Sequence, residues 1–138
     1  MNKYALDTNI ISYYLKGDKK LIDRINNEVK DGNIIIPPVV YFEIKKWLLK
    51  NNSKFKLAAF DALLGKYGID TISRKTLDIS LSICIDLKSK NITIDDADIF
   101  IAGYCIQNGY ILITDNTKHF ENIKNLKIDN WVSHNQII

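Results

Sequence analysis

Four acidic residues of this sequence occupy positions from which they could form one site. Asp7 and Asp115 each lie at the carboxyl end of a short apolar run that is typical of a buried strand. Glu43 and Asp98 each lie near the start of an expected helix. In a parallel sheet, the carboxyl ends of the strands and the starts of the helices that follow share one edge. We therefore expect the four carboxylates to converge there.

Carboxylates gathered in one place favour a bound cation. Each close pair repels by roughly 1 to 4 kcal/mol, depending on the effective dielectric constant. No His or Cys stands at ligand spacing, so we expect an oxygen-bound Mg²⁺ or Mn²⁺ rather than zinc. The isolated His119 and His134 are expected to have surface or loop-packing roles. An ion held by carboxylates at the mouth of a sheet suits hydrolysis of a phosphodiester bond.

Each acid also has a purely structural interpretation. These interpretations are helix caps at Asp7 and Thr8 and at Thr93, Asp95 and Asp96, a helix-dipole contact at Glu43, and an Asx turn at Asp115 and Asn116. If each acid had only its structural role, the presence of all four at one edge of the sheet would be a set of independent coincidences. We therefore prefer the shared site, with Asp7 as a metal ligand and Thr8 as the cap of the first helix.

The elements that must position these acids follow from hydrophobic periodicity and from Gly and Pro positions. Short strands are expected at 3–7, 33–37, 69–72, 110–114 and 126–131, and helices at 8–15, 18–31, 38–50, 54–64, 75–90 and 96–109. Pro38 suits the first position of its helix, while Gly65 and Gly68 should stop the helix of 54–64. Short apolar strands alternating with helices predict an α/β fold, with a central, mostly parallel sheet between two helix layers.

The composition is that of an ordinary globular domain. At 138 residues, with 46% hydrophobic and 25% charged residues, we expect residues 1–138 to form a single domain. No membrane span or signal peptide is expected, and Cys84 and Cys105 should be reduced thiols, so we expect a cytoplasmic protein. The net charge of +3 comes from 19 basic and 16 acidic residues and is weak support for a nucleic-acid partner. A codon bias toward Lys, Ile and Asn would also produce it.

Five segments together resemble the PIN domain, and specifically the VapC ribonuclease toxins of bacterial toxin–antitoxin pairs. They are LDTNIIS, YFEI, DADIFIAGYCIQNG, LITDNTKHFENI and IDNW, and they span nearly the whole chain. The resemblance implies a PIN-like fold and Mg²⁺-dependent endoribonuclease activity on an RNA substrate. It also implies a homodimer and a cognate antitoxin whose C-terminal segment covers the active site.

The same resemblance assigns roles to individual residues. Asp7, Glu43 and Asp98 match the metal-binding acids of the family, and Thr8 and Asn9 accompany the first of them. The fourth polar position matches Asp115, although many relatives have Asn there, so Asn116 or Glu121 could share this role. The chain departs from the family pattern in the apolar segment PPVVY before the glutamate and in the extra acids of TIDDAD.

Two other classes of function remain open at this point. One is a phospho-acceptor or phosphatase-type domain, but Asn9 stands where such phosphatases usually have a second Asp, and Thr114-Asp115 where a receiver would have Lys. The other is a PIN-like module that binds RNA without cleaving it. The full set of acids favours catalysis over both alternatives.

The partner surfaces are predicted from apolar residues and charge. The helices of residues 39–64 have more apolar residues than one core-facing stripe needs, which indicates a homodimer interface. The residues concerned are Trp47, Leu48, Phe55, Leu57, Phe60 and Leu63. An internal helical hairpin could instead bury them. The antitoxin is expected to place a basic side chain opposite the acids.

Overall fold

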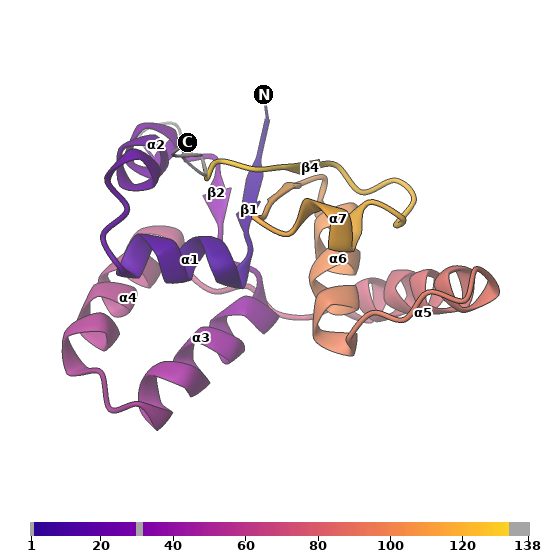
Figure 1. Cartoon of the computed structure of the whole chain (residues 1–138), viewed down its shortest axis with the longest axis horizontal. Helices are drawn as coiled ribbons and strands as arrows, with labels where there is room; N and C mark the ends of the chain where they lie inside the picture. The colour runs from indigo at the N-terminus through magenta and orange to yellow at the C-terminus, as the bar shows by residue number, and fades with distance from the viewer. Residues whose placement is uncertain (1, 30–31, 133–138) are drawn as a thin grey trace, which may run out of the picture.

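The structure, a computed structural model, describes residues 2–29 and 32–132. The elements in chain order are β1 (Tyr4–Leu6), α1 (Thr8–Leu15), α2 (Lys19–Val29), β2 (Ile34–Ile35), α3 (Pro38–Lys50), α4 (Lys54–Tyr67), α5 (Arg74–Ser89), α6 (Asp96–Asn108), β3 (Ile111–Ile113), α7 (Thr117–Phe120) and β4 (Ile128–Asp129). In Figure 1, α1 to α4 lie to the left of β1 and α5 to α7 lie to its right. His134 and the expected last residues of the second helix lie outside the described residues.

The four strands form one parallel sheet in the order β2-β1-β3-β4. β1 occupies a central position, where Tyr4 is in register with Ile34 of β2 and with Ile111 of β3. The central strands are buried on both faces, which is why they are apolar at successive positions. Ala5, Leu6, Leu112 and Ile113 are all fully buried. Because β1 and β3 are direct neighbours, the residues that follow them meet at one edge of the sheet.

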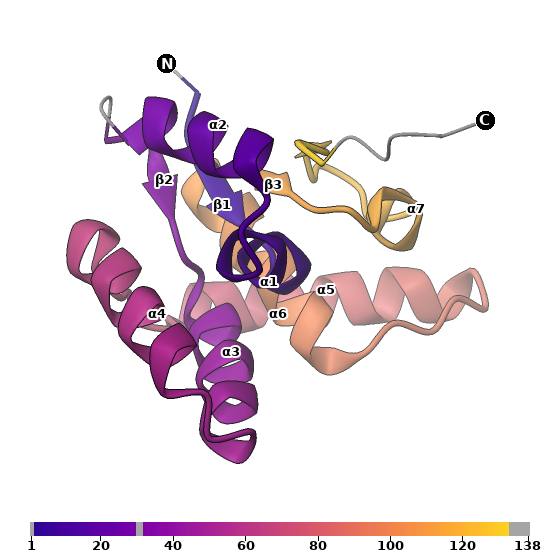
Figure 2. The same cartoon turned by 60° about the vertical axis from the view of Figure 1, so that its left-hand side comes forward.

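Helices cover both faces of this sheet. Figure 2 shows α1 and α2 in front of the strands and α5 and α6 behind them. The two rear helices pack so closely that a Cβ atom added at Gly103 would lie 2.2 Å from the Ser80 hydroxyl oxygen. Gly109, with a φ of 72°, then ends α6 in the left-handed conformation that glycine adopts most readily. The expected α/β fold with a parallel sheet between helix layers is confirmed.

Two local expectations are wrong. Residues 69–72 form no strand: Ile69 and Ile72 are exposed, and the segment is fastened by a hydrogen bond of 2.7 Å from the Tyr104 hydroxyl to Asp70 Oδ2. A strand needs a neighbouring strand to pair with its backbone groups, and the β-branched residues of this segment do not supply one. The helix α4 also continues through Gly65 to Tyr67 and ends only at Gly68, where φ is 72°.

The six apolar residues expected at a dimer interface divide into buried and exposed members. Leu48, Phe60 and Leu63 are buried inside the protein, and Leu57 is partly buried against the same core. The α3–α4 hairpin therefore uses part of the apparent surplus internally, as the alternative interpretation held. Trp47 and Phe55 remain exposed.

Two expectations from the composition can be compared with the structure directly. Cys84 and Cys105 are both free thiols, as expected. Burial raises the pKa of the Cys105 thiol, which makes it an inert core side chain. Within residues 2–29 and 32–132, no helix is long and apolar enough to cross a membrane.

Candidate active site

Asp7 lies where strand β1 becomes helix α1. Its Oδ1 accepts a hydrogen bond of 2.8 Å from the Thr8 backbone N–H, and its Oδ2 accepts one of 2.8 Å from the Thr114 hydroxyl. The Asp7 N–H donates to the Ile113 carbonyl at 2.9 Å, which continues the pairing of β1 with β3. Asp7 is therefore itself the cap of α1, and the expectation that Thr8 provides this cap is wrong. Capping and a place in the site are compatible roles for this residue.

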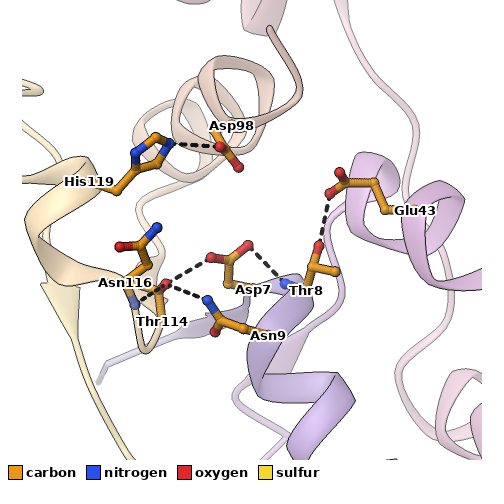
Figure 3. A network of polar contacts seen from close by, with 8 residues as sticks. All are labelled: Asp7, Thr8, Asn9, Glu43, Asp98, Thr114, Asn116 and His119. Atoms are coloured by element: carbon orange, nitrogen blue, oxygen red, sulfur yellow. Dashed lines mark hydrogen bonds and ion pairs between the residues drawn. The ribbon is translucent and has the colours of Figure 1, made fainter. Parts of the chain in front are cut away.

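Thr114 connects the first strand end to the loop after β3. Its hydroxyl is fully buried and accepts hydrogen bonds from Asn9 Nδ2 at 3.3 Å and from the Asn116 backbone N–H at 3.0 Å. A hydroxyl has two acceptor positions and one donor. Because both acceptor positions are occupied, the hydroxyl hydrogen points at Asp7 Oδ2 (Figure 3). Thr114 thus holds the Asp7 carboxylate in one orientation.

The surroundings of the Asp7 carboxyl raise its pKa. Its side chain is almost fully buried, and its pKa is raised to about 6, chiefly because burial removes water from the charged form. The hydrogen bonds from Thr114 and Thr8 oppose this rise, while the negative charges of Asp98 and Glu43 add to it. The negative charges of Asp98 and Glu43 therefore act on Asp7.

Glu43 reaches the site from the second turn of α3. Its Oε1 accepts a hydrogen bond of 2.8 Å from the Thr8 hydroxyl, which joins residues 35 positions apart in the sequence. Pro38 begins this helix at its first turn, as expected, and so sets where Glu43 falls along it. Thr8 consequently serves both acids: its N–H binds Asp7 and its hydroxyl binds Glu43 (Figure 3).

Asp98 lies in the first turn of α6 and contacts a histidine. His119 Nε2, from the short helix α7, lies 2.8 Å from Asp98 Oδ2. The His119 and Phe120 rings pack in an edge-to-face arrangement, with ring centroids 5.3 Å apart and planes at 88°. His119 is therefore part of the site, and its expected surface or loop-packing role is corrected here. Figure 3 shows the carboxylates of Asp98 and Asp7 pointing toward one another.

Asp115 is engaged by groups other than the three acids. Its Oδ2 accepts a hydrogen bond of 2.9 Å from the Tyr13 hydroxyl, and its Oδ1 accepts one of 3.1 Å from Asn130 Nδ2. Its backbone N–H donates to Asn9 Oδ1 at 3.0 Å. These contacts fasten the loop after β3 to α1 and to the segment after β4. They do not join Asp115 to the other acids, and its role as a ligand stays a prediction.

The two alternatives for the fourth polar position differ in their surroundings. Asn116 belongs to the network through its backbone N–H, which binds the Thr114 hydroxyl. Its side chain is drawn above Thr114 in Figure 3, on the side of His119. Glu121 is exposed and follows the last residue of α7. Asn116 is therefore better placed than Glu121 to take part.

The donor set can be compared with the needs of Mg²⁺. Asp7, Glu43 and Asp98 supply oxygen atoms, the ligand type that this hard cation prefers. In the part of the chain that the structure describes, no group of three His, Cys, Asp or Glu side chains is close enough to form a ready cage. Mg²⁺ usually keeps several of its waters and binds through one or two carboxylates, so it does not need such a cage. The residues fit this ion by chemistry and charge.

Sequence reasoning did not assign Thr114 and His119 to the site. The signal for Thr114 was present, because it is the first polar residue after β3, the neighbour of β1. The contact of His119 with Asp98 joins positions 21 residues apart, and the one-turn helix that creates it was not expected. Without this helix in the prediction, nothing in the sequence placed His119 beside Asp98.

Comparison with known proteins shows the family of this chain. The chain matches the family model described as PIN domain over residues 4–126. It is 28% identical over 130 residues to the Ribonuclease VapC2 of Rickettsia felis, covering 93% of this chain and 97% of the relative. It is 24% identical over 133 residues to the tRNA(fMet)-specific endonuclease VapC of Shigella flexneri, covering 95% and 99%.

Solved structures show the same fold. A crystal structure of VapBC2 from Rickettsia felis bound to a DNA fragment from its promoter contains a chain that matches with a TM-score of 0.87 and 27% identity. This match covers 94% of the present chain and 98% of that chain. VapBC-1 from nontypeable Haemophilus influenzae matches with a TM-score of 0.81 and 24% identity, over 94% and 98% of the two chains. The fold and the resemblance drawn from the sequence motifs are thereby confirmed.

Proposed function

This chain belongs to the PIN domain family, and from that premise we propose that it is a Mg²⁺-dependent endoribonuclease, the toxin of a toxin–antitoxin pair. Two relatives described above are named as a ribonuclease and an endonuclease, and this chain matches nearly the full length of each. The observation that carries the proposal is the buried Asp7 carboxylate at the end of β1, whose pKa is raised to about 6 chiefly by burial and to a smaller extent by the charges of Asp98 and Glu43. Acids held together in this way are suited to a cation rather than to a purely structural role.

Asp7, Glu43 and Asp98 would hold the ion, with Asp115 or Asn116 at the fourth polar position. When bound there, Mg²⁺ or Mn²⁺ would polarise the phosphate and lower the pKa of the attacking water. Residues next to the acids would orient the carboxylates. Thr8 and Thr114 orient Asp7, Thr8 also orients Glu43, and His119 orients Asp98.

The partner proposal follows from the same charges. Solved relatives include VapBC assemblies. An antitoxin that places a basic side chain among the acids would compete with both the cation and the RNA. The proposal also includes a homodimer, which sedimentation at micromolar protein concentration would detect, and a cytoplasmic location, where the free thiols Cys84 and Cys105 would stay reduced.

Turnover of RNA tests the proposal. The purified wild type should cleave RNA with Mg²⁺ and stop when a chelator is added, and Asp98→Asn should be inactive under both conditions. RNA binding by the wild type without cleavage at any Mg²⁺ or Mn²⁺ concentration would identify a non-catalytic module. Labelling of the protein by a small-molecule phosphodonor, with no RNA turnover, would support the phospho-acceptor alternative.

A further inference from the structure

A groove between α1 and α3 leads away from the acids. Its volume is about 290 Å³, and it starts where Thr8 and Glu43 are hydrogen-bonded to each other. The residues lining it combine acid-site members with apolar and basic side chains: Thr8, Ser12, Glu43, Ile44, Lys46 and Trp47. Glu43 and Trp47 are one helical turn apart, about 6 Å along the axis of α3. A ligand at the acids would therefore have Trp47 within reach of its neighbouring part.

The exposed aromatic rings next to this groove are paired with lysines. Trp47 is 41% exposed, and Lys56 Nζ from α4 lies 5.4 Å from its ring centroid. Phe42 is 61% exposed, and Lys46 Nζ lies 5.3 Å from its ring centroid. Large aromatic side chains are normally buried, whereas here two of them lie at the surface beside cations. Each pair offers a flat π surface and a positive charge together.

These groups occupy one side of α3. At 100° per residue, Phe42, Lys46, Lys50, Glu43 and Trp47 fall within a sector of about 140°. The buried residues Val40, Ile44 and Leu48, which pack in the core, lie in the adjoining sector, which begins about 20° beyond Trp47. The hydrophobic core does not use the outer side of α3, so core packing does not explain why aromatic residues and lysines lie there.

Positive charge is concentrated on the same hairpin. Together, α3 and α4 contain six lysines and two acidic residues, an excess of four positive charges. The whole chain has a net charge of only +3. A general codon bias toward lysine would spread the excess over the chain and would not place it beside the acids.

We infer that the α1–α3 groove and the outer side of α3 bind single-stranded RNA beside the acids, with a base stacked on Trp47 and phosphates near Lys46 and Lys50. This inference rests on the proposed function and extends it to the way the substrate is held. Stacking on aromatic rings combined with lysine contacts to phosphates is how proteins bind single strands with little sequence preference. A protein partner would also cover exposed rings, but the excess positive charge favours a polyanion.

Binding measured without turnover tests the inference. The probe is a fluorescein-labelled single-stranded RNA of about 12 nucleotides, a length within the usual range of such sites. Anisotropy is recorded in chelator, so that no cleavage is expected. Trp47→Ala should weaken binding by about 5- to 150-fold, whereas Trp47→Tyr should stay near wild type. Lys46→Gln and Lys50→Gln should each lower the slope of log affinity against log salt by about 0.7.

Matched controls lie on α5, away from the groove. Leu81→Ala removes a side chain that is 60% exposed, and Lys75→Gln removes an exposed charge. Both should bind the probe like the wild type, and melting temperatures of all variants check folding. Equal affinity of Trp47→Ala and wild type would overturn the inference. If Trp47→Ala instead changed only self-association in sedimentation, the surface would belong to a protein partner, which would also overturn it.

The outcomes separate this inference from the proposed function. Binding that depends on Trp47, in a protein that never cleaves RNA with Mg²⁺ or Mn²⁺, would contradict the nuclease assignment and leave the binding surface standing. Cleavage that is abolished by Asp98→Asn but independent of Trp47, with unchanged binding by Trp47→Ala, would contradict only the surface.

Discussion

His119 Nε2 lies 2.8 Å from Asp98 Oδ2, a contact that connects the short helix α7 to the first turn of α6. The imidazole ring also packs in an edge-to-face arrangement with Phe120. When a neighbouring residue holds one oxygen of a metal-binding carboxylate, the carboxylate loses fewer orientations on binding the ion. His119 is thus a positioning residue for Asp98 in the proposed site.

We predict that His119→Ala lowers the rate of RNA cleavage by about 10- to 100-fold and raises the Mg²⁺ concentration needed for half-maximal activity. His119→Gln should recover part of both losses because its amide can still donate a hydrogen bond. The neighbouring exposed residue offers a control, Lys118→Ala, which should keep the wild-type Mg²⁺ requirement. An unchanged Mg²⁺ requirement in His119→Ala would remove the positioning role.

Thr114 should contribute through its hydroxyl alone. Thr114→Val keeps the shape but leaves Asp7, Asn9 and the Asn116 N–H without this partner, each loss being worth about 1–3 kcal/mol when buried. We expect a lower free energy of unfolding in urea together with strongly reduced cleavage. Thr114→Ser keeps the hydroxyl and should be much closer to wild type. Similar behaviour of Val and Ser variants would show that the hydroxyl is not used.

The raised pKa of Asp7 predicts a specific pH dependence of stability. The folded-state pKa of about 6 exceeds the ordinary value of 3.8 for an Asp side chain, so the folded protein holds the proton more tightly than the unfolded chain. In chelator, this group should therefore lower the free energy of unfolding as the pH rises from about 4 to about 6, by on the order of 3 kcal/mol. Asp7→Asn removes this dependence.

Melting curves at two pH values measure that effect. Asp7→Asn should melt above the wild type at pH values over 7 in chelator, and the difference should shrink toward pH 4. The increase in the free energy of unfolding of Asp7→Asn is reduced by about 1 kcal/mol, because one amide oxygen replaces two carboxylate acceptors. If Asp7 served only as a cap, substitution by Ala would lower stability by about 1 kcal/mol at either pH. Lower melting of Asp7→Asn at every pH would contradict the buried charge.

Metal should stabilise the folded protein by linkage. At a tenfold excess over the dissociation constant, Mg²⁺ or Mn²⁺ should raise the free energy of unfolding of the wild type by about 1.4 kcal/mol. Asp98→Asn should respond less, because it lacks one of the proposed ligands. Asp78→Asn removes an exposed acid on α5 and should respond like the wild type. If the metal raised the free energy of unfolding equally in all three proteins, the ion would bind elsewhere.

The sequence was sufficient for the parts of the site that depend on short-range patterns. Asp7 follows an apolar strand, and Glu43 and Asp98 lie near helix starts, so a parallel sheet brings them to one edge. The surroundings of Asp115 depend on Tyr13, which is 102 positions away, and on Asn130. These partners come from distant parts of the chain, and no local sequence pattern predicts them.

The same limit explains the wrong strand at residues 69–72. Ile69, Thr71 and Ile72 are β-branched residues, which favour strands, but strand formation depends on a neighbouring strand. The Tyr104 hydroxyl, 34 positions away, binds Asp70 instead and fastens the segment to α6. The apolar content of the α3–α4 hairpin was also a misleading sign of an interface for Leu48, Phe60 and Leu63, because these residues belong to the core.

The central claim is that Asp7 and Asp98 act as one unit in metal-dependent cleavage of RNA. The most direct test compares RNA cleavage by wild type, Asp7→Asn, Asp98→Asn and the double variant across a Mg²⁺ titration. Residues that work as a unit are not additive, so each single variant should lose about as much activity as the double variant, and excess Mg²⁺ should rescue none of them. Near-wild-type cleavage by either single variant, or cleavage by the wild type in chelator, would contradict the account.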